Sequence, residues 1–199
     1  MSTARENILS RVRSSLRRLD GGAPASVPPV RLTPSEVAPE VRTEQFRTAL
    51  ELLNGKVYAA ETPEAARDRV QALVGDRPVV MTNSSVLARC GIYYESVATP
   101  DAAVGITGAE YALADTGTLV VMSATEARLA SLLPPVHIAV IESSRILTGL
   151  DELLIQEPRP GDRTASMVLI TGPSRTADIE QILVRGVHGP GEVHVVILM

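Results

Sequence analysis

The apolar residues of this chain fall mainly into short, nearly unbroken runs, with helical patterns between them. Four such runs occupy residues 57–60, 78–82, 136–142 and 193–198. A strand with one face in water alternates apolar and polar residues, whereas a strand that is covered on both faces does not. The pattern therefore predicts an α/β fold in which helices cover both faces of a largely parallel sheet.

The segments between these runs carry helix signals. Thr62, Pro63 and Glu64 supply an N-cap, a proline at the first helical position and an acid in the first turn, so a helix is predicted from there to about residue 74. The remaining expected elements are helices over 43–53, 84–89, 144–155 and 177–183, a helical turn over 108–113, and strands over 103–106, 118–122 and 167–171.

The first forty residues differ from the rest of the chain. An apolar stripe that includes Ile8 and Val12 predicts an amphipathic helix within residues 1–20, and the other face of this helix is rich in arginine. That basic face is either a solvated surface or a docking surface for a partner subunit or an acidic surface. Five prolines then predict an extended linker or arm over 21–40, ahead of a compact α/β domain over 41–199.

Composition excludes several classes of function. The chain has 199 residues, a net charge of −4 and only 3% aromatic residues, so it offers nucleic acid neither general attraction nor stacking platforms. No apolar run approaches the roughly 20 residues that span a bilayer. The charged N-terminal segment does not have the pattern of a signal peptide. We therefore expect no nucleic-acid partner, no membrane span and a cytoplasmic location.

Cysteine and histidine usage limits the cofactors that this chain can bind alone. Cys90 is the single cysteine, so an internal disulfide or a cluster held by cysteines of this chain is impossible. The three histidines are not at helical metal-ligand spacing. We expect no cofactor and no metal in this chain.

The first candidate site lies in the turn-rich segment 105–121. It contains two carboxylates, Glu110 and Asp115, which are candidate catalytic residues because paired carboxylates can divide acid and base roles, or one can attack an acyl group. In the alternative, Glu110 only opens a short helix and Asp115 only begins a turn. The neighbouring candidate ligand-binding residues are Thr116, Gly117 and Thr118.

The second candidate site follows the apolar run 167–170, where a Gly-Pro turn leads into hydroxyl groups, one arginine and the predicted helix. Strand ends and helix N-terminal N–H groups converge at such loops in open α/β proteins. Helix capping and the helix dipole explain most of its polar residues, including Asp178 and Glu180. A cation at a helix N-terminus is unfavourable, so Arg175 predicts either a bound anion or a salt bridge to a residue such as Asp115.

A glycine-rich turn over 186–191 places His188 where its ring could be exposed and titrate near neutral pH, or could make a purely structural hydrogen bond. The candidate ligand-binding residues of these two segments are Gly172, Ser174, Arg175, Thr176 and His188.

Together, these motifs resemble the LUD-domain family. The resemblance covers about residues 42–199 and rests on 105–110 with 114–118, on 132–134 with His137, and on 171–180 with 186–190. It implies a fold similar to that of the CoA-transferase and ribose-5-phosphate isomerase superfamily. It also implies a role in the oxidation of L-lactate to pyruvate, together with two iron–sulfur partner proteins.

Three hypotheses follow for the function. Because this chain has one cysteine, the first is a non-redox subunit whose iron–sulfur partners carry the electrons. The second is a free-standing enzyme or binding protein for a small carboxylate, CoA ester or sugar phosphate. The third is a ligand-sensing or purely structural module. A single cleft shared by Glu110, Asp115, Arg175 and His188 would favour a site, whereas separate faces would favour a scaffold.

Overall fold

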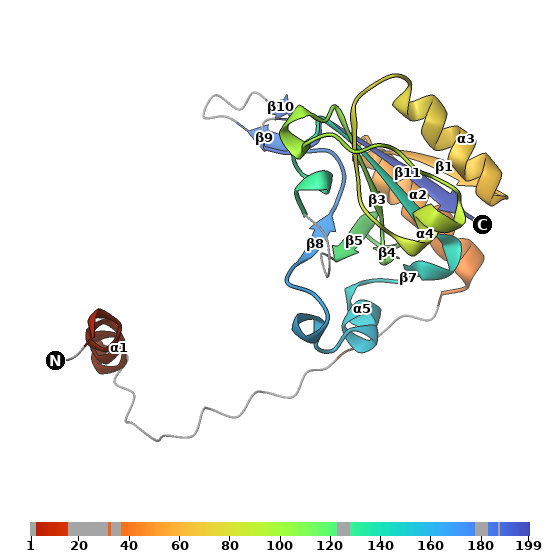
Figure 1. Cartoon of the computed structure of the whole chain (residues 1–199). Helices are drawn as coiled ribbons and strands as arrows, with labels where there is room; N and C mark the ends of the chain where they lie inside the picture. Colours follow the sequence, from red (N-terminus) through yellow and green to blue (C-terminus); the bar gives the residue numbers. More distant parts are fainter. Residues whose placement is uncertain (1–2, 16–31, 33–36, 123–127, 178–182, 187) are drawn as a thin grey trace. The chain divides into compact units, whose positions relative to one another are not determined.

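The computed structural model describes residues 3–15, 32, 37–122, 128–177, 183–186 and 188–199 (Figure 1). The chain divides into two units, Met1–Arg31 and Leu32–Met199. In the first unit, helix α1 (Ala4–Ser15) begins with a capping box. The hydroxyl of Thr3 accepts a hydrogen bond from the N–H of Glu6 at 3.3 Å, and the Glu6 carboxylate accepts one from the N–H of Thr3 at 2.7 Å. Residues 16–20 of the predicted helix lie outside the described residues.

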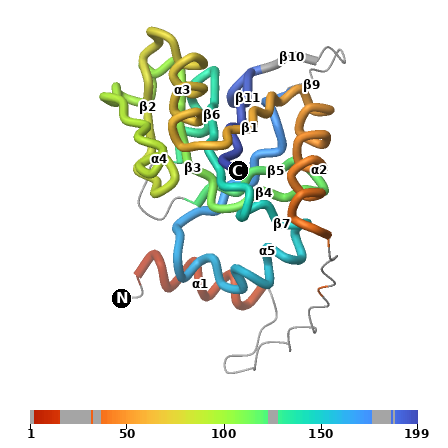
Figure 2. Tube along the Cα trace, turned by 90° about the vertical axis from the view of Figure 1, so that its right-hand side faces the viewer, coloured from red at the N-terminus to blue at the C-terminus, as the bar shows by residue number. Residues whose placement is uncertain are grey.

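A five-stranded parallel sheet forms the centre of the second unit (Figures 1 and 2). Its strands are β1 (Lys56–Ala60), β2 (Val79–Met81), β3 (Val104–Gly108), β6 (Val136–Glu142) and β11 (Glu192–Leu198). Their order in the sheet is β1–β11–β6–β3–β2, and all four pairings are parallel. The three central strands are buried along nearly their whole length, which explains why their sequences do not alternate. The prediction of a largely parallel sheet is confirmed.

One face of this sheet is covered by helices α3 (Pro63–Val74) and α4 (Ser85–Arg89). Helix α3 starts where it was predicted. Thr62 caps it, since its hydroxyl accepts a hydrogen bond from the N–H of Ala65 at 3.2 Å. The apolar side chains of both helices pack on alternate residues of the strands, including Ile138 and Val140 of β6.

The opposite face is covered by helix α2 (Pro39–Leu52) and by a second sheet (Figure 2). Phe46 and Leu50 of α2 pack with Ala139, Ile141 and Val195 of the parallel sheet. The second sheet has the order β7–β4–β5–β8, with antiparallel pairing except between β4 and β7. Its strands are β4 (Tyr111–Leu113), β5 (Thr118–Met122), β7 (Ile146–Leu147) and β8 (Met167–Ile170). This face therefore carries one helix and a sheet, where helices alone were expected.

The remaining elements are shorter. Helix α5 (Leu150–Gln156) buries Leu153 against β4 and β7. Short 3₁₀ turns occupy Thr99–Asp101, Arg128–Ser131, Ser143–Arg145 and Pro160–Asp162. None of the helices in the described part of the chain has the length and apolar character that a bilayer crossing requires.

Two predicted helical segments are partly or wholly wrong because strand pairing replaces them. In place of a helical turn over 108–113, the chain stays extended: the N–H of Ala109 donates to the carbonyl of Val140 at 3.0 Å, and the N–H of Glu110 to that of Val120 at 3.0 Å. The predicted helix over 144–155 is helical only in its later part, since β7 pairs with β4 before α5 begins.

The third correction concerns the predicted helix over 177–183. Strand β9 (Arg175–Ala177) instead pairs antiparallel with β10 (Leu183–Arg185), so the polar loop leads into a β-ribbon and Ser174 and Thr176 do not precede a helix. The middle of this segment, 178–182, including Asp178 and Glu180, lies outside the described residues. Local capping signals are overridden here by pairing between two segments of the chain.

His137 is fully buried within β6. Its Nε2 atom lies 2.8 Å from the hydroxyl of Thr107, and its Nδ1 atom has no hydrogen-bond partner in the described part of the protein. Burial, with a smaller contribution from His194, lowers the pKa of His137 from 6.5 to about 4. The folded protein therefore holds this ring neutral under conditions in which an unfolded chain would protonate it.

This depressed pKa predicts how stability depends on pH. The stabilisation that neutral His137 gives is fully present above pH 6.5 and is lost as the pH falls from 6.5 to about 4, because the unfolded chain binds the proton more readily. Urea unfolding across this range should show that the wild type loses roughly 2–3 kcal/mol more than His137→Gln. His194, whose pKa burial also lowers, is present in both proteins, so the difference reports His137. His188→Gln, at an exposed histidine, is the control, and parallel curves for the wild type and His137→Gln would contradict the prediction.

Candidate functional site

Polar side chains gather at the carboxyl ends of β2, β3 and β6, where they line a cavity of about 310 Å³. We call this cavity the polar cleft. In parallel α/β sheets, ligands bind outside the carboxyl ends of the strands, so its position is that of a binding site. Its main polar residues are Asn83, Ser84, Ser85, Glu110, Arg145 and Arg163.

Two turns form the floor of the polar cleft, one after β2 and one after β3. Asn83, Ser84 and Ser85 connect β2 to α4, and Gly108 ends β3 beside them. A Cβ atom on Gly108 would lie 1.9 Å from the Oγ atom of Ser84, so only glycine allows the two turns to approach so closely.

Glu110 enters the polar cleft from the link between β3 and β4. Its Oε2 atom accepts a hydrogen bond from the N–H of Met122, the last residue of β5, at 2.8 Å. The carboxylate therefore braces the second sheet.

Two charged side chains of the polar cleft, Glu142 and Arg163, form ion pairs, and Arg145 instead contacts an aromatic ring. Glu142 forms an ion pair with Arg89 at 2.8 Å, and Arg163 forms one with Glu157. The Arg145 guanidinium lies over the ring of Tyr111, 5.7 Å from its centroid, and no carboxylate of the described residues is within ion-pair distance of it. Arg145 is therefore a cation available to an anionic ligand.

The ring under Arg145 belongs to Tyr111, and a hydrogen bond from its hydroxyl holds this ring in place. Its hydroxyl donates a hydrogen bond to the Glu157 carboxylate at 2.9 Å. Burial and that hydrogen bond raise the pKa of Tyr111, so the phenol stays neutral and keeps donating.

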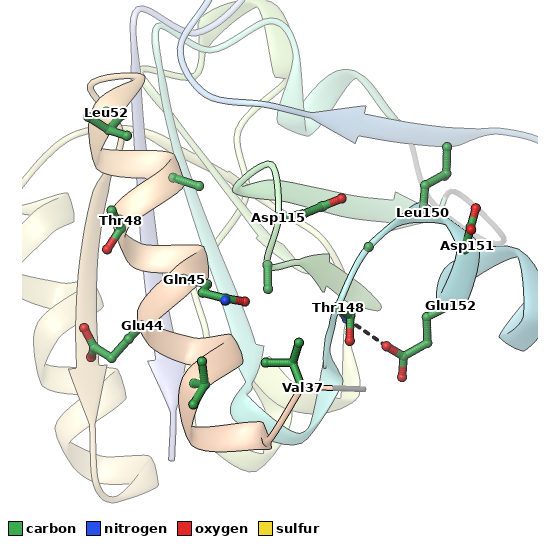
Figure 3. Close-up of a pocket in the computed structure, with 14 residues that line it drawn as sticks. Val37, Glu44, Gln45, Thr48, Leu52, Asp115, Thr148, Leu150, Asp151 and Glu152 are labelled. Atoms are coloured by element: carbon green, nitrogen blue, oxygen red, sulfur yellow. Dashed lines mark hydrogen bonds between the residues drawn. The ribbon is translucent and has the colours of Figure 1, made fainter. Parts of the chain in front are cut away.

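A second hollow, of about 820 Å³, lies between α2, the turn after β4 and the start of α5 (Figure 3). We call it the acidic groove, because its carboxylates are Glu44, Asp115, Asp151 and Glu152. The Glu152 carboxylate accepts from the N–H of Thr148 at 2.7 Å and pairs with Arg42 at 3.2 Å. Burial raises the pKa of Glu152, but these partners outweigh burial and the net effect is a lowered pKa.

Asp115 and its neighbours form a junction with the end of α2. A chain of hydroxyl groups runs from Asp115 through Thr116 and Thr118 to Thr171, with distances of 3.1, 2.8 and 2.9 Å. Gly117 has a positive φ of 65°, and a Cβ atom there would lie 2.5 Å from the backbone nitrogen of Leu50. The turn therefore packs directly on the helix backbone.

The same junction contains Gly172 and Arg175. Gly172 has a φ of 95°, and a Cβ atom there would lie 3.2 Å from that of Leu53. The Arg175 guanidinium donates a hydrogen bond to the carbonyl of Leu53, just beyond α2. Helix α2 has no basic residue in its last turn, so Arg175 supplies the cation that a helix C-terminus favours. Within the described residues Arg175 makes no ion pair with Asp115.

The remaining candidate ligand-binding residues are Ser174, Thr176 and His188. The segments that carry them meet near the amino ends of β6 and β11. The N–H of Ser174 donates to the carbonyl of Pro190 at 2.8 Å, so the structure brings these two segments together. The turn is tied to the start of β6, because the N–H of Gly191 donates to the carbonyl of Pro135 at 2.9 Å. His188 is exposed in this turn, and Thr176 lies in β9.

The predicted site residues therefore do not surround one cavity. Glu110 lines the polar cleft and Asp115 lines the acidic groove, at opposite ends of β4. Arg175 lies at the end of α2, and His188 lies at the amino ends of the parallel strands. Their individual roles stay predictions. The described residues include no group of three or more His, Cys, Asp or Glu side chains arranged to hold a metal ion.

Sequence reasoning missed most of the polar cleft. The turn Asn83–Ser85 had a signal, since it directly follows an apolar run that predicts a strand. Arg145 and Arg163 had none, because they reach the cleft from segments far along the chain.

Comparison with known proteins adds the family context. A family model for the LUD domain matches residues 96–198. The uncharacterized protein YkgG of Escherichia coli is 33% identical over an alignment of 169 residues, and the match covers 73% of this chain and 73% of that protein. Lactate utilization protein C is 43% identical in Halalkalibacterium halodurans and 44% identical in Bacillus subtilis, each over 92 residues. Those 92 residues cover 44% of this chain but only 40% and 38% of these two relatives, so the matched part spans less than half of their length.

A solved structure shares the fold. The crystal structure of a DUF162 family protein from Deinococcus radiodurans matches with a TM-score of 0.65 and 16% sequence identity. The match covers 82% of this chain and 100% of that one. At this level of identity the likeness concerns the fold alone.

The contact of Arg175 with α2 predicts a structural effect. Arg175→Ala removes a donor and a cation from the helix C-terminus and should lower the free energy of unfolding by about 0.5–1.5 kcal/mol in urea titrations. Arg175→Lys keeps the charge and should lose less. The matched control is Arg159→Ala, which removes an exposed arginine paired with Asp162 at 3.3 Å. Equal stability of Arg175→Ala and the wild type would show that this contact does not stabilise α2.

Proposed function

Because the chain belongs to the LUD-domain family, we propose that it acts in lactate utilization. In this proposal it is a non-redox subunit that supports the oxidation of L-lactate to pyruvate, and iron–sulfur partner proteins take up the electrons. The observation that carries the proposal is its similarity to relatives named lactate utilization protein C.

The redox chemistry supports assigning electron transfer to partners. Conversion of L-lactate to pyruvate releases two electrons and two protons, and an acceptor must take the electrons. The single cysteine of this chain, Cys90, is buried, and burial raises the pKa of its thiol. Metals and clusters bind the thiolate, so this environment is a poor one for a cluster ligand.

The geometry of the polar cleft supports a substrate-binding role for this subunit. The cleft lies at the carboxyl ends of parallel strands, is small, and contains a guanidinium without a carboxylate partner among the described residues. We therefore favour a subunit that holds the carboxylate substrate while its partners accept electrons.

The polar cleft also favours one alternative. Its described lining combines a cation with neutral hydrogen-bonding groups, so a protein acting alone on a small carboxylate could use the same cleft. The carboxylate pair that first suggested such an enzyme is less favourable to it, because Glu110 and Asp115 line different hollows.

Deletion of the gene tests the proposed role. The deletion strain should fail to grow on L-lactate as sole carbon source, and expression of the full chain should restore growth. Growth on pyruvate should be normal, because pyruvate is the product of the blocked step. Unimpaired growth on L-lactate would overturn the proposal.

Purification tests the partners. The tagged full chain, isolated from cells grown on L-lactate, should elute with proteins that show iron–sulfur absorption and bound iron. An untagged strain is the control. If the chain is required for growth on lactate but elutes alone, the free-standing alternative replaces the subunit proposal.

A further inference from the structure

Arg145 rests against an ordered aromatic ring in the polar cleft. Its guanidinium lies over the ring of Tyr111, a buried residue whose hydroxyl is bonded to Glu157. A guanidinium that already lies over an aromatic ring gives up less side-chain freedom when it binds an anion than one that extends into solvent. Arg145 is exposed, so a ligand reaches it from solvent.

The turn after β2 supplies neutral hydrogen-bonding groups across the cleft. Asn83, Ser84 and Ser85 line it, and within the described residues their side chains make no hydrogen bond to the protein. Strand β3 lies between β2 and β6 in the sheet, so this turn and Arg145, which follows β6, flank Gly108 from its two sides. A ligand in the polar cleft would meet the Arg145 guanidinium and the amide and hydroxyl groups of this turn, because all of them line it.

We infer that the polar cleft binds a small 2-hydroxy or 2-oxo monocarboxylate, with Arg145 on its carboxylate and the Asn83–Ser85 turn on the oxygen of the adjacent carbon. A guanidinium forms two parallel hydrogen bonds to a carboxylate. Amide and hydroxyl groups both donate and accept, so the same turn receives a 2-hydroxyl or a 2-oxo group. The inference rests on the proposed function for the choice of 2-hydroxy and 2-oxo acids, whereas the cation and the neutral hydrogen-bonding groups are features of the cleft itself.

The charges of the cleft favour a monoanion over a dianion. Arg163 and Glu142 are already in ion pairs, so Arg145 is the described cation of the cleft with which a ligand carboxylate can pair. A phosphate dianion would bring a second negative charge, for which the described lining of the cleft offers no further unpaired cation. Phosphate should therefore bind more weakly than a 2-hydroxy acid, although it carries more charge.

Isothermal titration calorimetry of the full chain tests this site with four ligands: L-lactate, pyruvate, propionate and inorganic phosphate. Propionate has the carboxylate but lacks the oxygen on the adjacent carbon. L-Lactate and pyruvate should bind more tightly than propionate and phosphate. Arg145→Gln should weaken binding of both by about tenfold or more, and Arg145→Lys by less. The control Arg159→Gln, at an exposed arginine outside the cleft, should bind as the wild type does.

A second variant separates the two halves of the site. Ser85→Ala should weaken L-lactate binding and leave propionate binding unchanged, because propionate has no oxygen for this hydroxyl. Circular dichroism and thermal unfolding of each variant should match the wild type, since Arg145 and Ser85 are both exposed.

Three results would overturn the inference: no saturable binding of L-lactate or pyruvate to the wild type, unchanged affinity in Arg145→Gln, or tightest binding of phosphate. The growth and binding experiments test different proposals. If the chain binds L-lactate but the deletion strain grows normally on it, the binding site stands and the role in lactate utilization is wrong. If the deletion strain fails to grow but the chain does not bind L-lactate or pyruvate, the role stands and the binding site is wrong.

Discussion

One extended segment passes directly from the parallel sheet into the second sheet, and two adjacent N–H groups of this segment bond one to each sheet. The N–H of Ala109 bonds to Val140 in the parallel sheet, and the N–H of Glu110 bonds to Val120 in the second sheet. The chain therefore leaves one sheet and enters the other within a single residue. Because this transfer occurs at the carboxyl end of β3, it also creates the floor of the polar cleft. The bond from Met122 to the Glu110 carboxylate strengthens the same joint.

A second junction holds α2 against the turn that follows β4. Gly117 and Gly172 allow the backbone to approach the end of the helix, and Arg175 binds the carbonyl of Leu53. Both glycines adopt a positive φ, where other residues would be strained. The polar motif that is most conspicuous in the sequence therefore has a structural role in the described part of the protein, and the side chains of the polar cleft lie elsewhere.

Sequence reasoning succeeded where local pattern and tertiary environment agree. The apolar runs predicted the parallel strands, and Thr62 with Pro63 predicted the start of α3. It failed where distant pairing decided the structure. Arg175 was expected just before a helix, with a bound anion or a salt bridge, but it lies in β9, which pairs with β10, and its guanidinium binds a carbonyl 122 positions away. Arg145 was missed for the same reason. Its importance comes from stacking on Tyr111, and no neighbouring residue in the sequence signals that contact.

The separation of the two candidate carboxylates limits the chemistry that this chain can perform alone. A mechanism that divides acid and base roles needs both groups at one substrate. Glu110 and Asp115 are separated by β4, which by itself spans about 10 Å, and they line different hollows. A small carboxylate in the polar cleft would meet Arg145 and Glu110 but not Asp115. Substrate binding by this chain and electron acceptance by its partners is the division of labour that this arrangement favours.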